Sequence, residues 1–189
     1  MRSIMRSRAV TLMLGCALLA SCTQAPPASG GFLGATSSDS AFTSAPGGCA
    51  YSFLFDNFII RRAAPVAGAP APEAMTQARS ATLNAPAHVA AANVVISVHG
   101  ATLSSGGATG QLEIAFGDSS QTFELSAPAG EGEAGGNFEH SFTAPAVSGA
   151  NTLRVTATLA AAPANEAQIH IDSVDLEIQD APYCTSAPE

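Results

Sequence analysis

The residues best suited to acid–base or metal chemistry in this chain are four scattered histidines, His88, His99, His140 and His170. None stands in the H-E-x-x-H spacing that would place two histidines on one metal ion. His170 and Asp172 are two residues apart in a predicted strand, so their side chains share its outward face and could touch one ligand together. The more ordinary interpretation is an exposed strand face. His140 lies between Phe138 and Phe142, and we interpret it as a satisfied or edge-lying histidine on the core side.

Two glycine-rich catalytic patterns give no support for an enzyme. Residues 130–135 spell G-x-G-x-x-G, but no helix pattern follows them, and Glu131 and Glu133 would repel a phosphate. We interpret this segment as a flexible, solubilising loop. The chain contains no G-x-S-x-G, the usual elbow of serine hydrolases. We therefore expect no enzymatic activity; the alternative is an enzyme whose site follows no recognisable motif.

The N-terminal 22 residues combine a basic start, an apolar run and a cysteine. Residues 9–20 form an apolar run shorter than the ~20 residues that a transmembrane helix needs. The following Leu19-Ala20-Ser21-Cys22 resembles the lipobox of bacterial lipoproteins. That resemblance implies cleavage before Cys22, acylation of its thiol and anchoring in the bacterial cell envelope, where each buried CH₂ contributes ~0.8 kcal/mol. The alternatives are an ordinary secretory signal cut near Ala20 and an uncleaved membrane anchor.

The same resemblance sets the expected compartment and domain boundaries. Thr23 stands where an Asp would imply retention in the inner membrane, so we expect the outer membrane. Residues 1–21 would be the signal peptide and 22–48 the lipidated cysteine with a flexible Ala/Ser/Gly/Pro linker. The folded domain would span residues 49–184, followed by a short tail at 185–189.

The charge of the chain excludes nucleic acid as a partner. Its formal net charge is −8, and removal of the signal would leave only four arginines (61, 62, 79 and 154) against fifteen acidic residues. Such a chain has no basic patch for a phosphate backbone. It also has no attraction to anionic lipids, so the acyl chains must provide the contact with the membrane.

Two of the four cysteines remain for the domain, Cys49 and Cys184, one near each of its ends. In an exported chain they most simply form a disulfide, which requires the two ends of the domain to lie side by side. Two reduced, buried thiols are the alternative. A metal site is not expected, since no His or Cys stands at ligand spacing from either cysteine.

Apolar residues alternate with polar ones through most of the remaining chain. This period of two predicts seven strands, at residues 50–61, 93–99, 111–116, 122–125, 137–143, 152–159 and 167–179. Residues 117–120 form a hairpin turn. Residues 50–61 carry apolar side chains on both faces, which favours a strand covered on both sides. Residues 72–83 are predicted to form a short helix with Met75, Arg79 and Leu83 on one face.

Together these elements predict an all-β fold, an antiparallel β-sandwich. The last strand contains a phase break, because Ile169 and Ile171 have one parity and Val174, Leu176 and Ile178 the other. One extra residue at Asp172-Ser173 would turn all five toward the core, so we predict a β-bulge there.

The closing stretch at 168–178, QIHIDSVDLEI, resembles the last strand of jelly-roll, galactose-binding-like domains, including many carbohydrate-binding modules. In that family the first Asp of this motif often helps to hold a structural Ca²⁺ near the N-terminal strand. Asp172 matches by position, and Asp56 would be a second ligand if the first and last strands adjoin. Ca²⁺ takes roughly six to eight oxygens, so two carboxylates are only a start, and two exposed acids beside a bulge are the alternative. No other cofactor is expected.

Two functions of different classes remain. We favour a structural or partner-binding domain on an envelope lipoprotein, because the chain lacks catalytic motifs and has few aromatics suited to stacking on sugars. The alternative is a glycan-binding module, which the jelly-roll resemblance implies. Trp is absent, and only Tyr51 and Tyr183 offer a tyrosine face for a sugar ring.

Overall fold

The computed structural model describes residues 30–38, 40–64, 66–68, 73–104, 107–127, 134–160, 166–179, 181 and 183–184. The predicted lipidation site, Cys22, lies outside these residues. Eleven strands and one short 3₁₀ helix are found within them. The elements are β1 (Ala35–Thr36), β2 (Ser40–Ser44), η1 (Pro46–Gly48), β3 (Ala50–Phe55), β4 (Ile59–Arg62), β5 (Met75–Ala85), β6 (Asn93–Ser104), β7 (Ala108–Phe116), β8 (Ser119–Ala127), β9 (Ala134–Pro145), β10 (Gly149–Leu159) and β11 (Ala167–Ile178).

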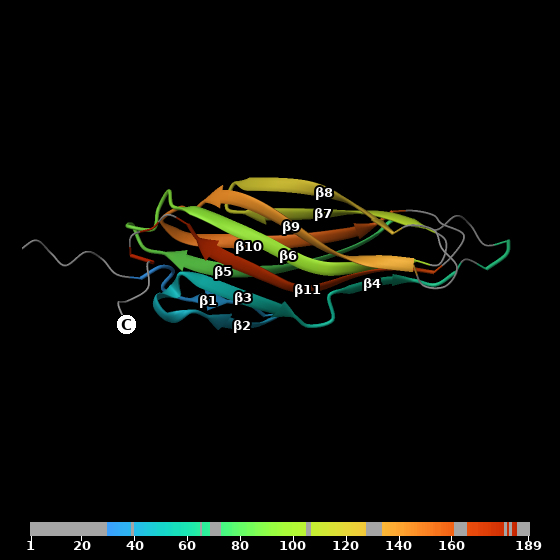
Figure 1. Cartoon of the computed structure of the whole chain (residues 1–189), viewed down its shortest axis with the longest axis horizontal. Helices are drawn as coiled ribbons and strands as arrows, with labels where there is room; N and C mark the ends of the chain where they lie inside the picture. The colour runs from blue at the N-terminus through green and yellow to red at the C-terminus, as the bar shows by residue number, and fades with distance from the viewer. Residues whose placement is uncertain are drawn as a thin grey trace, which may run out of the picture.

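Two antiparallel sheets pack face to face, which confirms the predicted all-β sandwich. Sheet A has the strand order β1-β5-β10-β7-β8, and sheet B has the order β2-β3-β11-β6-β9, with β4 also paired to β11. Figure 1 shows an elongated molecule in which β6, β9 and β11 face the viewer. Strands β8 and β9 are the last strands of their sheets and run along the same long side.

The core lies between the sheets because strands of both sheets alternate in burial. On β6, Val94, Ile96 and Val98 are fully buried while the residues between them are partly exposed. On β10, the odd-numbered residues from Asn151 to Leu159 are buried in the same way. This is the period of two that the sequence displays.

Residues 50–61 form two strands instead of the single predicted one. Asp56 and Asn57 make a turn, with Asn57 at a φ of 50°. Odd-numbered residues are buried before this turn and even-numbered residues after it. As a result Phe53 and Phe58, of opposite parity, both point into the core, whereas Leu54 is 54% exposed. The expectation of a strand covered on both faces is therefore wrong, because the turn brings both apolar sets to one side.

The helix predicted at residues 72–83 is also wrong. This region contains β5, which pairs with β10 along its whole length, from Met75↔Leu159 to Ala85↔Gly149. Ala81, Leu83 and Ala85 alternate and are buried. The helix preference of its Ala, Met, Gln and Arg residues is outweighed by pairing and burial, which decide strand formation in context.

The flexible linker predicted for residues 22–48 is wrong from Gly30 onward. Phe32 is only 5% exposed, and its ring packs edge-on against Tyr51 and Phe116. Its amide donates to the carbonyl of Gly48, 2.8 Å away, and β2 pairs with β3. A Cβ on Gly31 would collide with the Gly48 carbonyl oxygen, so this glycine permits the close approach of the two segments.

The bulge and the disulfide are both confirmed. The register of β11 against β6 shifts between Ile171 and Ser173, and the apolar residues on both sides of the shift are buried. Cys49 and Cys184 form a disulfide with their Cα atoms 5.6 Å apart.

The described residues include no helix long and apolar enough to cross a membrane.

Candidate functional site

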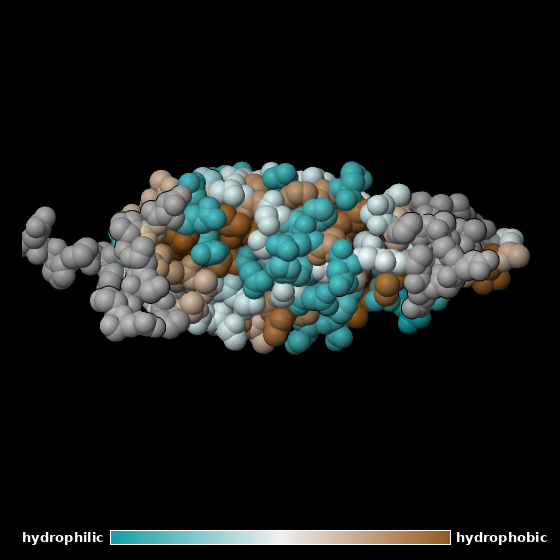
Figure 2. Space-filling view, in the orientation of Figure 1, coloured by the Kyte–Doolittle hydropathy of each residue, from teal (hydrophilic) through white to brown (hydrophobic). Residues whose placement is uncertain are grey.

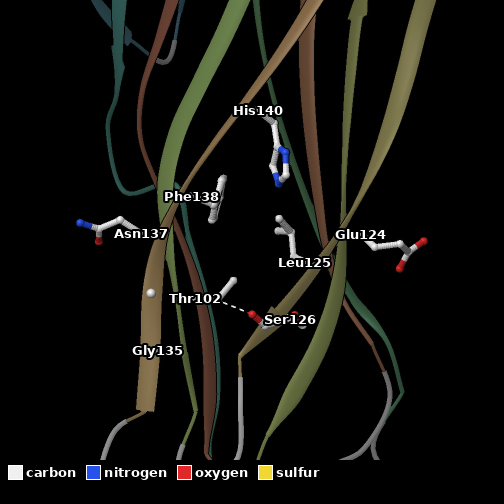
Figure 3. A pocket seen from close by; sticks show the side chains of 9 residues that line it. Thr102, Glu124, Leu125, Ser126, Gly135, Asn137, Phe138 and His140 are labelled. Carbon is white, nitrogen blue, oxygen red and sulfur yellow. Dashed lines mark hydrogen bonds between the residues drawn. The ribbon is translucent and has the colours of Figure 1, made fainter.

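A groove opens along the side of the sandwich where β8 and β9 face each other (Figure 3). Its volume is about 350 Å³, at the lower end of the range for small-ligand pockets. The lining residues come from β6, β8 and β9: Thr102, Glu124, Leu125, Ser126, Gly135, Gly136, Asn137, Phe138 and His140. Because both strands are edge strands, inward-facing side chains that would be sealed elsewhere in the sandwich are reachable here.

Two of the lining residues, Phe138 and His140, belong to a stack of three aromatic rings that is completed by Phe123. The imidazole of His140 lies 4.6 Å from the ring of Phe123 and 5.5 Å from the ring of Phe138, at interplanar angles of 18° and 29°. We call Phe123, His140 and Phe138 the ring stack. All three residues are partly exposed, so the stack is held by packing and still reaches solvent.

The sequence positions the ring stack through strand alternation and one glycine. Phe138, His140 and the buried Phe142 share the inward side of β9, while Phe123 and the buried Leu125 share the inward side of β8. Opposite Phe138 on β6 stands Gly100, where a Cβ would lie only 2.6 Å from the Cζ of Phe138. The missing side chain therefore makes the space in which the Phe138 ring lies.

The polar groups of the groove lie at its floor and rim. The hydroxyl of Thr102 donates to the carbonyl of Ser126 over 3.2 Å and so ties β6 to β8. The carboxylate of Glu124 accepts a hydrogen bond from Gln111, and Figure 3 shows Glu124 and Asn137 pointing away from the centre of the groove. At Gly136 a Cβ would meet nothing within 4 Å, so the backbone there is open to a ligand.

His140 is the lining residue of the groove whose protonation is affected by its burial in the fold. Burial lowers the pKa of its imidazole below the usual value for histidine. The side chain is therefore neutral at pH 7. A neutral imidazole has one nitrogen that donates and one that accepts a hydrogen bond.

The ligand-facing pair predicted from the sequence, His170 and Asp172, lies on a different surface, the outer face of sheet B. His170 Nδ1 and Asp172 Oδ1 are 3.2 Å apart, so the structure brings together the two residues that the sequence placed on one face. Nearby, His99 Nε2 lies 3.1 Å from Asp175 Oδ2. Figure 2 shows hydrophilic residues gathered across the middle of this face. These histidines are thus paired with acids on an exposed sheet surface.

The two predicted calcium ligands both lie near the break between β3 and β4. Asp172 stands at the bulge of β11, and the amide of its neighbour Ile171 donates to the carbonyl of Phe58, just after Asp56 in the chain. The backbone carbonyl of Asp56 faces the guanidinium of Arg79 at 3.5 Å, and the Asp172 carboxylate faces His170. No three His, Cys, Asp or Glu side chains of the described residues are grouped as metal ligands. Calcium at Asp56 and Asp172 stays a prediction.

Sequence reasoning placed Phe138 and His140 on the core side of a strand but missed the groove and the part of Phe123 in it. The alternating pattern was visible on both strands. What it lacked was the strand order, which makes β8 and β9 facing edges.

Comparisons with known proteins give distant structural similarity only. No family model matches the chain, and no curated protein matches it. Among solved structures, TmCBM61 in complex with β-1,4-galactotriose has a TM-score of 0.36 and 16% identity, over 77% of this chain and 88% of that one. The CBM22-1–GH10 modules of Clostridium thermocellum xylanase 10B, complexed with xylohexaose, have a TM-score of 0.26 and 14% identity, over 82% of this chain and 27% of that one. The chain thus has distant structural similarity to β-sandwiches of carbohydrate-binding modules.

Proposed function

We propose that this β-sandwich is a non-catalytic binding module whose groove between β8 and β9 holds a sugar ring. The observation that carries the proposal is the ring stack, of which Phe138 and His140 line the groove. The C–H face of a sugar packs on aromatic rings, while its hydroxyls need hydrogen-bonding groups at the edges. His140, the Ser126 backbone and the open backbone at Gly136 supply such groups. The scarcity of Tyr and the lack of Trp do not count against binding, because Phe138 offers an aromatic ring in their place.

The titratable groups of the groove favour binding over catalysis. Hydrolysis of a glycosidic bond typically uses two carboxyl groups on opposite sides of the bond. Among the lining residues Glu124 is the one carboxylate, and it points away from the groove toward Gln111.

A glycan array probed with the full chain tests this function, with Phe138→Ala and Phe42→Ala as matched variants. Phe42 is 44% exposed on β2, at the other side of the sandwich, and packs against Tyr51 and Phe53. We expect saturable binding that Phe138→Ala weakens by about fivefold, since loss of one ring contact is worth about 1 kcal/mol, and that Phe42→Ala leaves intact. Absence of binding across a broad array, or equal loss in both variants, would refute the proposal.

A second candidate function is docking of a protein partner in the cell envelope. Strand β2 is the edge strand of sheet B on the side opposite β9, and four of its five residues are exposed. An exposed edge can accept a strand from another chain. Crosslinking in cells from a position on β2 should trap one dominant partner. If crosslinks are dispersed over many proteins, or depend on the groove instead, this candidate fails.

We propose further that Cys22 carries a lipid and holds the module at the outer membrane. The lipobox resemblance and the acidic composition support this, since electrostatics gives the chain no affinity for an anionic surface. Mass spectrometry of the membrane-extracted protein should find an acylated Cys22 as the first residue. A Cys22→Ser variant should leave the membrane fraction, and its retention there would contradict the anchor.

A further inference from the structure

We propose that the groove admits uncharged sugar rings and excludes rings that bear a carboxylate, with His140 as the residue that sets this preference. The inference rests on the proposed sugar-binding function and names the class of sugar.

Among the residues that the structure describes, the groove offers no cation to an acidic sugar. None of its lining residues is Lys or Arg, and the residues that join β8 to β9, 128–133, have the sequence PAGEGE. Arg61 and Arg62 lie on β4 and Arg79 on β5, strands that do not border the groove, and Arg154 is exposed on β10. The guanidinium of Arg62 is already bound to the carbonyls of Ala160 and Glu73.

A carboxylate placed against the ring stack would lose its hydration without gaining a counter-ion. Leu125 and Thr102, both buried, form the adjacent surface, and the hydroxyl of Thr102 is committed to Ser126. Burial of an unpaired charge is strongly unfavourable, whereas a hydroxyl needs only a hydrogen-bond partner. The carboxylate of Glu124 at the rim adds repulsion.

His140 can serve hydroxyls because no described residue forms a hydrogen bond or ion pair with its ring nitrogens. Among the described residues its interactions are the two ring contacts, and its partner across β6 is Val98. Glu124 is the other titratable group of the groove, and it points outward. In its neutral form the imidazole can both donate to and accept from sugar hydroxyls. In its protonated form it becomes a cation, so the preference against acidic sugars should shrink in acid.

Calorimetric titration of the full chain with matched oligosaccharides tests this inference. The probes are β-1,4-linked glucohexaose, galactohexaose and mannohexaose, each beside the same sugar oxidised at C6 to the uronate. At about pH 7.5 we expect a neutral hexaose to bind at least about tenfold more tightly than its oxidised counterpart. At about pH 5 a larger fraction of His140 is protonated, although burial lowers its pKa below that of an ordinary histidine, so this ratio should be smaller than at about pH 7.5.

His140→Gln is the matched variant, since glutamine also donates and accepts but does not titrate. In this variant the ratio should be the same at both pH values. Equal or tighter binding of the oxidised sugar at about pH 7.5 would overturn the inference and leave the sugar-binding function standing, as would a pH dependence that survives in His140→Gln. If no neutral hexaose binds, the proposed function itself is refuted, and the inference with it.

Discussion

At the scale of single residues, the burial of His140 makes the stability of the fold depend on pH. Its pKa is lowered in the folded state by burial, while in the unfolded chain it stays near ~6.5. Between these two values the unfolded state binds more protons, so stability falls with falling pH. The contribution is present in full above about pH 6.5 and is lost as the pH drops through the folded-state pKa. Lowering the pH from about 8 to about 5 should therefore reduce the free energy of unfolding of the wild type more than that of His140→Gln. Urea denaturation at the two pH values measures both changes. Equal losses in the two proteins would contradict this.

Gly100 is the residue on which the position of Phe138 depends. A Gly100→Ala substitution would force the Cβ against the Phe138 ring and the His170 carbonyl. We expect a loss of about 1–3 kcal/mol in the free energy of unfolding, typical of overpacking, together with loss of sugar binding. Gly34→Ala is the control, since a Cβ there meets nothing within 4 Å and should change stability little. Chemical denaturation of both variants measures the difference, and similar values for the two would show that the ring moves freely.

At the scale of elements, the bulge in β11 keeps both halves of that strand in the core. Deleting Asp172 would remove the extra residue, and the apolar residues on both sides of it would then alternate on one face of a regular strand: Ile169, Ile171, Val174, Leu176 and Ile178. We therefore expect the deletion variant to fold, with β11 paired to β6 without the bulge. Asp172→Ala keeps the bulge and the chain length and serves as the control, which should also fold. Circular dichroism and thermal unfolding check this, and a deletion variant that fails to fold would contradict the account.

Strand alternation in the sequence was sufficient to predict β6, β7, β10 and β11, because their inward residues are large and aliphatic. It was insufficient for β5, whose inward residues are mostly alanines that also favour helix. The break at Asp56-Asn57 was missed because a two-residue turn changes the phase without any glycine or proline to mark it. The alternation of apolar and polar residues thus identifies a strand when the buried side chains are bulky. Where they are small, as in β5, pairing with a strand far away in the sequence decides that the segment is a strand.

At the scale of the whole molecule, the N-terminal segment that was predicted to be a linker is part of the core. Phe32→Ala should cost about 3–5 kcal/mol, as for other buried aromatic side chains, because the ring touches residues of both sheets. Leu33→Ala is the matched neighbour, since Leu33 is 78% exposed and should change stability little. Urea denaturation of both variants measures these changes in the free energy of unfolding. An equally small change in both would contradict a place for this segment in the core.

The disulfide closes the domain by joining residues 135 positions apart. In the chain-entropy model a loop of this size is worth about 5 kcal/mol, the upper end of what disulfides contribute. Replacing both cysteines with alanine should therefore lower the free energy of unfolding by up to about 5 kcal/mol. A variant as stable as the oxidised wild type would show that the segment around Phe32 holds the ends together by itself.

The position of the groove could not be read from the sequence, because it depends on the order of strands in two sheets. The residues that form it were visible as inward positions on two strands, but only the pairing of β9 with β6 and of β8 with β7 makes these strands facing edges. The pair His170–Asp172 was predictable, because it depends on a spacing within one strand.

The most direct test of the central claim is to map which residues of the full chain respond to a bound sugar by nuclear magnetic resonance. With a neutral hexaose from the panel, the side-chain resonances of Phe123, Phe138 and His140 should shift together in a saturable manner, while those of His99 and His170 on the outer face of sheet B stay in place. Shifts confined to His99 and His170 would contradict the account and move the binding site to the outer face of sheet B.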